Sequence, residues 1–106
     1  MGKYMLRTSY TPSGLKGLIA EGGTGRREAL RQTVESIGGT LEGFYYALGD
    51  DDLYLIADLP DETAALSLSL NIAAAGALTV AVTVLVDPET VDEAVARGVA
   101  YRPPGA

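Results

Sequence analysis

Three glycines within four positions, followed by two arginines, form the segment of this sequence that most resembles a ligand-binding loop. Residues 22–28 read GGTGRRE and precede a helical run. Backbone N–H groups at a helix N-terminus attract anions, and Arg26 and Arg27 would add positive charge to a phosphate site. However, the spacing matches neither of the two common phosphate loops, and no strand precedes the glycines. We therefore interpret the segment as a joint between two helices and expect it not to bind nucleotides.

A run of three aspartates, Asp50–Asp52, is the second candidate. Carboxylate oxygens suit Ca²⁺ and Mg²⁺, but the alternating ligands and the distal glutamate of an EF-hand loop are missing. Aspartate is also a favoured turn residue. We expect a turn here, with no metal and no cofactor.

Aromatic and charged side chains on strands form the third candidate. Arg7 alternates with Leu6, so it lies on the strand face that points away from the core. A charge on such a face is costly unless an ion pair or an anionic ligand satisfies it. Asp58 is the expected ion-pair partner, which is the alternative that we favour. In the other alternative Arg7, Tyr46, Tyr54 and Asp58 line a pocket for a small anionic or aromatic ligand.

The pattern of hydrophobic residues predicts the elements that must position these side chains. Segment 60–76 is ambiguous, because LSLSLNI alternates as a strand does, but Asp61 is a good N-cap and the leucines also recur at helical spacing. Thr24 looks like the N-cap of the second helix. Strands are expected at 3–10, 40–49, 52–59 and 77–86, and helices at 12–21, 25–37, 61–76 and 87–98.

This order is the ferredoxin-like plan β-α-β-β-α-β with a short final helix, an α+β fold with a four-stranded antiparallel sheet and helices on one face. We expect one domain over residues 1–106. The uncovered sheet face would carry Met5, aromatic side chains and half of an apolar last strand. The economical cover for such a face is a second copy, which predicts a homodimer or a multiple of one.

Composition narrows the function. The 106 residues carry a net charge of −6, which argues against nucleic acid and anionic membranes as partners. Neither cysteine nor histidine occurs, so thiol chemistry and the commonest general base are excluded. Neither a signal peptide nor a membrane span is visible, and we expect a cytoplasmic protein.

Three separated segments resemble the GYD-domain proteins, a family of small prokaryotic proteins. They are YTPSGLKGLIAEGGTGRREAL, ESIGGTLEGFYYALGDDDLYLIADLPD and the ending YRPPGA. The resemblance implies a ferredoxin-like domain that assembles as dimeric α+β barrels do, and it implies little about activity. Gly49 and Asp52 align with the glycine and the aspartate of the family motif, whereas Asp51 stands where the motif has tyrosine.

Two function classes remain open. The first is a homo-oligomeric binding or assembly module, with a ligand cleft between the open sheet face and the partner subunit. The second is a cofactor-free enzyme, similar to the monooxygenases and isomerases of the dimeric α+β barrel type, acting on a small aromatic or anionic substrate. The missing histidine weakens the second class.

Overall fold

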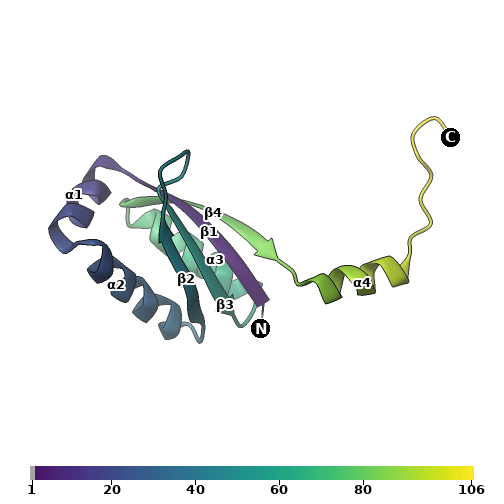
Figure 1. Cartoon of the computed structure of the whole chain (residues 1–106), viewed down its shortest axis with the longest axis horizontal. Coiled ribbons are helices and arrows are strands. Elements are labelled where there is room, and N and C mark those ends of the chain that lie inside the picture. The colour runs from purple at the N-terminus through teal and green to yellow at the C-terminus, as the bar shows by residue number, and fades with distance from the viewer. Residues whose placement is uncertain (1) are drawn as a thin grey trace.

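The computed structural model describes residues 2–106, which form four strands and four helices (Figure 1). The strands are β1 (Gly2–Tyr10), β2 (Thr40–Tyr46), β3 (Leu53–Leu59) and β4 (Leu78–Leu85). The helices are α1 (Pro12–Glu21), α2 (Gly23–Ser36), α3 (Glu62–Ala74) and α4 (Pro88–Arg97). Each expected element is present, and the ambiguous alternating leucines lie in helix α3.

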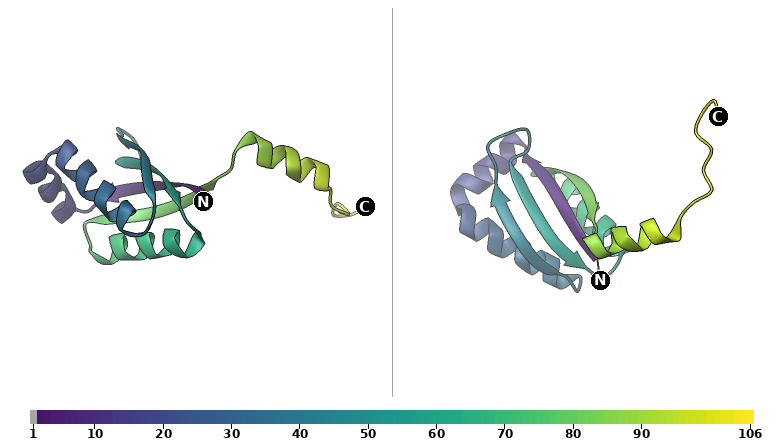
Figure 2. Two further views of the ribbon diagram at one scale, coloured as in Figure 1. Left: turned by 90° about the horizontal axis from the view of Figure 1, so that it is seen from below. Right: turned by 45° about the vertical axis from the view of Figure 1, so that its right-hand side comes forward.

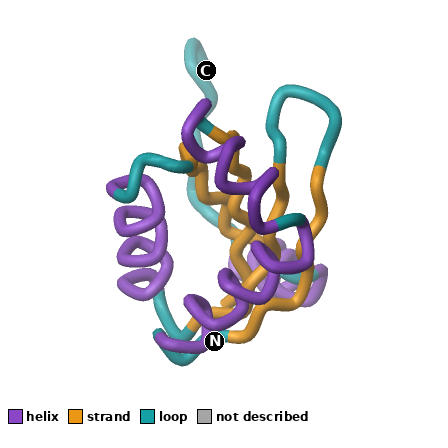
Figure 3. Tube along the Cα trace, turned by 90° about the vertical axis from the view of Figure 1, so that its left-hand side faces the viewer, coloured by secondary structure: helices purple, strands orange, loops and turns teal. Residues whose placement is uncertain are grey.

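The strands form one antiparallel sheet in the order β2-β3-β1-β4, so β1 is interior and β2 and β4 are the edges. Helices α1, α2 and α3 pack on one face, which confirms the ferredoxin-like α+β fold (Figure 2). The loop of residues 47–52 joins β2 to β3 and projects beyond the ends of the strands (Figure 3).

Side-chain caps explain where three of the helices begin. Thr11, Asp61 and Asp87 accept hydrogen bonds from the third backbone N–H beyond them, at the starts of α1, α3 and α4. The prediction that Thr24 caps α2 is wrong. That helix begins at Gly23, and its N-cap is Gly22, whose φ of 83° is a conformation that glycine adopts without strain.

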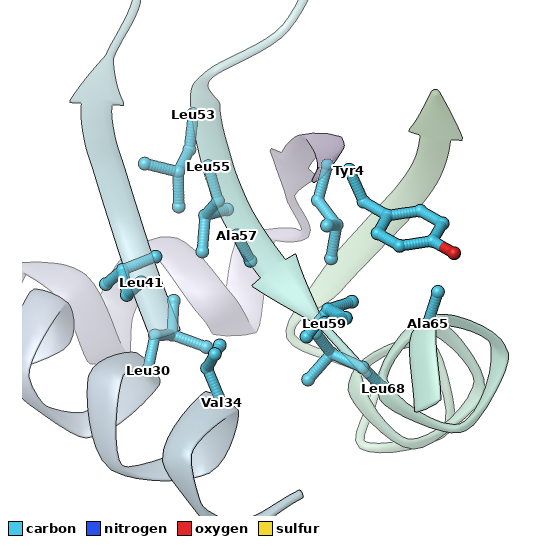
Figure 4. Packing of buried hydrophobic residues seen from close by; sticks show 11 residues of the cluster. Tyr4, Leu30, Val34, Leu41, Leu53, Leu55, Ala57, Leu59, Ala65 and Leu68 are labelled. Atoms are coloured by element: carbon cyan, nitrogen blue, oxygen red, sulfur yellow. The ribbon is translucent and has the colours of Figure 1, made fainter. Parts of the chain in front are cut away.

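The core lies between the helices and the inner sheet face, as Figure 4 shows. Alternating residues of β1 and β3 point into it, as the sequence predicts, and Leu30 and Val34 of α2 and Leu68 of α3 meet them. Burying such leucine side chains contributes about 1.5–3 kcal/mol each. The inward residues of the two central strands are Tyr4, Leu6, Thr8, Leu53, Leu55, Ala57 and Leu59.

The opposite sheet face carries no helix, and we call it the open face. Its composition differs from the prediction on β4, because the register with β1 turns the valines of this strand toward the helices. The half of β4 on the open face is less apolar than expected. It consists of Thr79, Ala81, Thr83 and Leu85.

Helix α4 follows β4 and lies apart from the sheet, as every view shows (Figures 1 and 2). None of its residues is buried. Within residues 2–106, no helix combines the length and the hydropathy needed to cross a bilayer.

Candidate functional site

Arg7 occupies the middle of the open face. It lies on the interior strand β1, opposite Tyr54 of β3 and Ala81 of β4. Its side chain is 44% exposed, and its Nη1 atom lies 3.5 Å from an Oδ2 atom of Asp51. The predicted position on the face away from the helices is therefore confirmed, but the carboxylate partner is not the expected one.

The expected pair of Arg7 with Asp58 is absent because of the strand register. Asp58 lies opposite Lys3, four residues along β1 from Arg7. Asp58 therefore lies beside Lys3 at one end of the open face, away from Arg7. The Oδ1 atom of Asp58 is buried and finds no hydrogen-bond partner among the described residues.

Three side chains contact the carboxylate of Asp51. Besides the contact with Arg7, Oδ1 accepts a hydrogen bond from the Ser9 hydroxyl at 3.4 Å, and Oδ2 accepts one from the Tyr54 hydroxyl at 3.5 Å. All three contacts are long, so the carboxylate holds none of its partners tightly. We call Arg7, Ser9, Asp51 and Tyr54 the Arg7–Asp51 cluster.

The neighbouring Asp52 explains why the loop reaches this cluster. Its backbone N–H donates to the carbonyl of Thr8 at 2.9 Å, and its carboxylate accepts from the backbone N–H of Tyr10 at the same distance. The aspartate of the family motif therefore fixes the loop to the end of β1. No heavy atom lies within 4 Å of the Cβ that a side chain at Gly49 would have, so packing does not require glycine there.

Tyr46 lies on the other side of the sheet from the predicted one. It pairs with the inward-facing Leu53, and its hydroxyl donates to the carbonyl of Gly23 at 3.1 Å. Burial, with a smaller effect of the neighbouring Tyr10, raises the pKa of Tyr46 to about 12, so the phenol stays a hydrogen-bond donor at neutral pH. Tyr45 takes its place on the open face, opposite Tyr54.

A β-bulge causes this exchange. Strict alternation from the buried Leu41 would turn Tyr45 inward and Tyr46 outward. The register between β2 and β3 shifts at Leu41 and Gly43, so Glu42 is the additional residue and the alternation reverses beyond it.

The opposite end of the open face is charged. The ammonium group of Lys3 lies 2.7 Å from the carboxylate of Glu42, and this hydrogen bond raises the pKa of Lys3 above its usual value. The pair is exposed, so it contributes little to stability. Lys3 and Glu42 thus lie at the end of the open face away from the hairpin loop and the Arg7–Asp51 cluster.

The two arginines of the glycine-rich segment lie away from the Arg7–Asp51 cluster, on the helix side. Arg26 faces the space between α2 and α3 and lies 3.7 Å from Glu21, whereas Arg27 lines the space between α2 and β2. The glycines form the joint between α1 and α2. The two guanidinium groups therefore do not share one cavity, which agrees with the interpretation as a joint.

The aspartate turn is present, and Asp50 and Asp51 belong to the loop. Over residues 2–106 no three histidine, cysteine, aspartate or glutamate side chains come together as metal ligands would. Of the expected site residues, Arg27 and Tyr46 line one space on the helix side. On the open face, the structure places Arg7 and Tyr54 in one cluster. Ser9 and Asp51 join them, and of these Ser9 was already visible in the sequence as a residue of the same strand face.

Comparison with known proteins identifies the family of the chain. The family model described as GYD domain matches residues 4–95, which include most of β1, all of β2 to β4 and most of α4. The chain therefore belongs to the GYD domain family. No curated protein and no solved structure matches it.

Proposed function

We propose that this GYD-domain protein is a self-associating module whose open face binds a small organic anion at Arg7. The observation that carries the proposal is the position of Arg7, a guanidinium in the centre of a sheet face that no helix covers. Its one ionic contact within residues 2–106, with Asp51, is 3.5 Å long. A guanidinium has five N–H donors, so most of them remain available for a carboxylate or phosphate group.

The surroundings favour an aromatic carboxylate with a hydroxyl group. Tyr54 lies beside Arg7, and Tyr45 lies opposite Tyr54, so two tyrosines follow one another on one side of Arg7. Asp51 would repel a bare dianion but would accept a hydrogen bond from a ligand hydroxyl. The carboxylate of such a ligand would contact Arg7, and its hydroxyl group would donate a hydrogen bond to Asp51.

The open face is also the surface through which two copies would pair. Met5, Ile56 and Tyr45 lie around the cluster, and Tyr45 is exposed. A second copy related by a two-fold axis would bury these side chains and would close the ligand between two sheets. Net repulsion between two copies of charge −6 is a cost that a salt-containing buffer screens.

Titration with 4-hydroxybenzoate, followed by ¹⁵N-resolved NMR, tests the binding site. We expect the Nε–Hε signal of Arg7 and the amide signals around Tyr54 to shift. The Arg7→Gln variant should lose these shifts, whereas Lys16→Gln, an exposed charge removal on α1, should keep them. Absence of shifts in the parent with this probe, or equal shifts in Arg7→Gln, would contradict the proposal.

A further inference from the structure

Helix α4 has an apolar stripe, as a helix packed on a core does, but none of its residues is buried. Val91 and Val95 lie one turn apart on it, and Val95 is 77% exposed. Val91 is 51% exposed, so both side chains of the stripe face solvent. A surface helix with an apolar stripe normally buries that stripe. The stripe of α4 therefore lacks its partner surface in the isolated chain.

An apolar groove of about 410 Å³ lies on the helix side of the sheet, between α3 and the edge strand β4. Tyr4 and Ala65 form its floor, and Leu66, Val82 and Val84 form its walls. Leu66 is 60% exposed, so the groove is open to solvent. It is thus an uncovered apolar surface beside an unpaired strand edge, a combination that native proteins usually protect.

We infer that α4 of one copy docks into this groove of a second copy and that the exchange is reciprocal. The valine stripe would enter the groove between α3 and β4. One ion pair is available to this docking, between Glu62, which lines the groove, and Arg97 in the last turn of α4. The other charged residues of α4 are Glu89, Asp92 and Glu93, so the apolar contact and not the net charge favours the docking. Exchange of an identical element between two copies is a simple route to a dimer.

The connection between β4 and α4 favours the second copy over the same chain. Only Val86 and Asp87 separate the two elements. Asp87 is held by the cap, because it accepts hydrogen bonds from the N–H and the hydroxyl of Thr90 at 3.0 and 2.7 Å. Docking within the chain would require a full reversal at Val86.

The shape of the chain agrees with this reasoning. The molecule measures 57 × 33 × 23 Å, and its radius of gyration is 17.0 Å. A compact chain of this length has a radius of gyration of about 13 Å. The extended positions of α4 and of residues 98–106 in Figures 1 and 2 account for the difference, and α4 thereby lies where another molecule can reach it.

Disulfide trapping tests the exchange, since the chain has no cysteine of its own. Val95→Cys and Leu66→Cys are made in separate chains, one of which carries a mass tag. After subunit exchange and mild oxidation, we expect a covalent heterodimer on a non-reducing gel. The matched control pairs Val95→Cys with Ile19→Cys, an exposed position on α1, and this mixture should lack the band.

Two results would overturn the inference. One is equal cross-linking with Leu66→Cys and with Ile19→Cys. The other is a double variant, Val95→Cys with Leu66→Cys, that closes its disulfide within a single chain. If the protein dimerises but the specific cross-link does not form, the proposed exchange of α4 is contradicted, whereas the proposed pairing of open faces still stands.

The docking also predicts a measurable loss of affinity. The Val91→Asp, Val95→Asp double variant changes only exposed side chains, so the single chain should fold as the parent does. Its dimer dissociation constant should rise about tenfold or more, since burying two carboxylates in an apolar groove is costly. An unchanged constant would contradict the inference.

Discussion

Gly14 permits a close approach of α1 to the loop between α3 and β4, and its replacement by alanine is a sharp test of the packing. Gly14 is buried in α1, and a Cβ atom there would lie 2.0 Å from the carbonyl oxygen of Ala77. An ordinary contact needs at least 3.4 Å, so the two backbones would have to separate by about 1.4 Å. Such a shift stretches the bonds from the N–H and the hydroxyl of Thr11 to the same carbonyl, now 3.0 and 3.3 Å long.

The expected magnitude combines three effects. Overpacking costs about 1–3 kcal/mol, and each weakened hydrogen bond costs about 1 kcal/mol. Alanine returns about 1 kcal/mol through its higher helix propensity. We therefore expect Gly14→Ala to lower the free energy of unfolding by about 2–4 kcal/mol in urea denaturation.

Gly17 supplies the matched control three residues further along α1. No atom lies within 4 Å of a Cβ placed there, so only the helix propensity changes. Gly17→Ala should therefore raise the free energy of unfolding by about 0.5–1 kcal/mol. If Gly14→Ala were as stable as the parent, or if both variants changed stability in the same direction, the proposed contact with Ala77 would be refuted.

Three further predictions concern single side chains. The difference in phenol absorbance between the parent and Tyr46→Phe should titrate near pH 12. Because the pKa of tyrosine in the unfolded chain is about 10, the raised pKa of Tyr46 stabilises the fold below pH 10, and this contribution is lost as the pH rises through about 12. Hydrogen bonds from Thr90 lower the pKa of Asp87, so the helicity of α4 measured by NMR should hold above the unfolded value of 3.8 and decline below it as Asp87 is protonated. Leu53→Ala should cost about 2–5 kcal/mol in urea unfolding because Leu53 is fully buried, whereas Leu48→Ala in the exposed loop should leave stability unchanged.

The fold was predictable because its hydrophobic pattern is strong where burial is complete. The alternation of β1 and β3 and the cap at Asp61 are local signals, and the structure confirms each of them. The prediction for Thr24 was wrong because a threonine before a helical run resembles an N-cap. In the structure Gly22, which has a positive φ, is the N-cap, and the helix begins before Thr24.

The candidate site was only partly predictable, because its geometry depends on pairing between strands. The register sets Asp58 opposite Lys3 and so away from Arg7, and a single bulged residue, Glu42, moves Tyr46 to the helix side. Neither register nor bulge is marked in the residues themselves. The partnership of Arg7 with Asp51 needs the hairpin loop to bend back onto β1, which only the three-dimensional structure reveals.

The central claim, that two copies meet through the open face, is tested most directly by sedimentation equilibrium of two lysine variants. Ile56 lies on the open face opposite Met5, whereas Leu48 is exposed on the loop. We expect Ile56→Lys to remain folded and to raise the dimer dissociation constant about tenfold or more, since it would bury an unpaired charge, and Leu48→Lys to match the parent. A parent that stays a folded monomer at micromolar concentration, or equal constants for both variants, would contradict the claim.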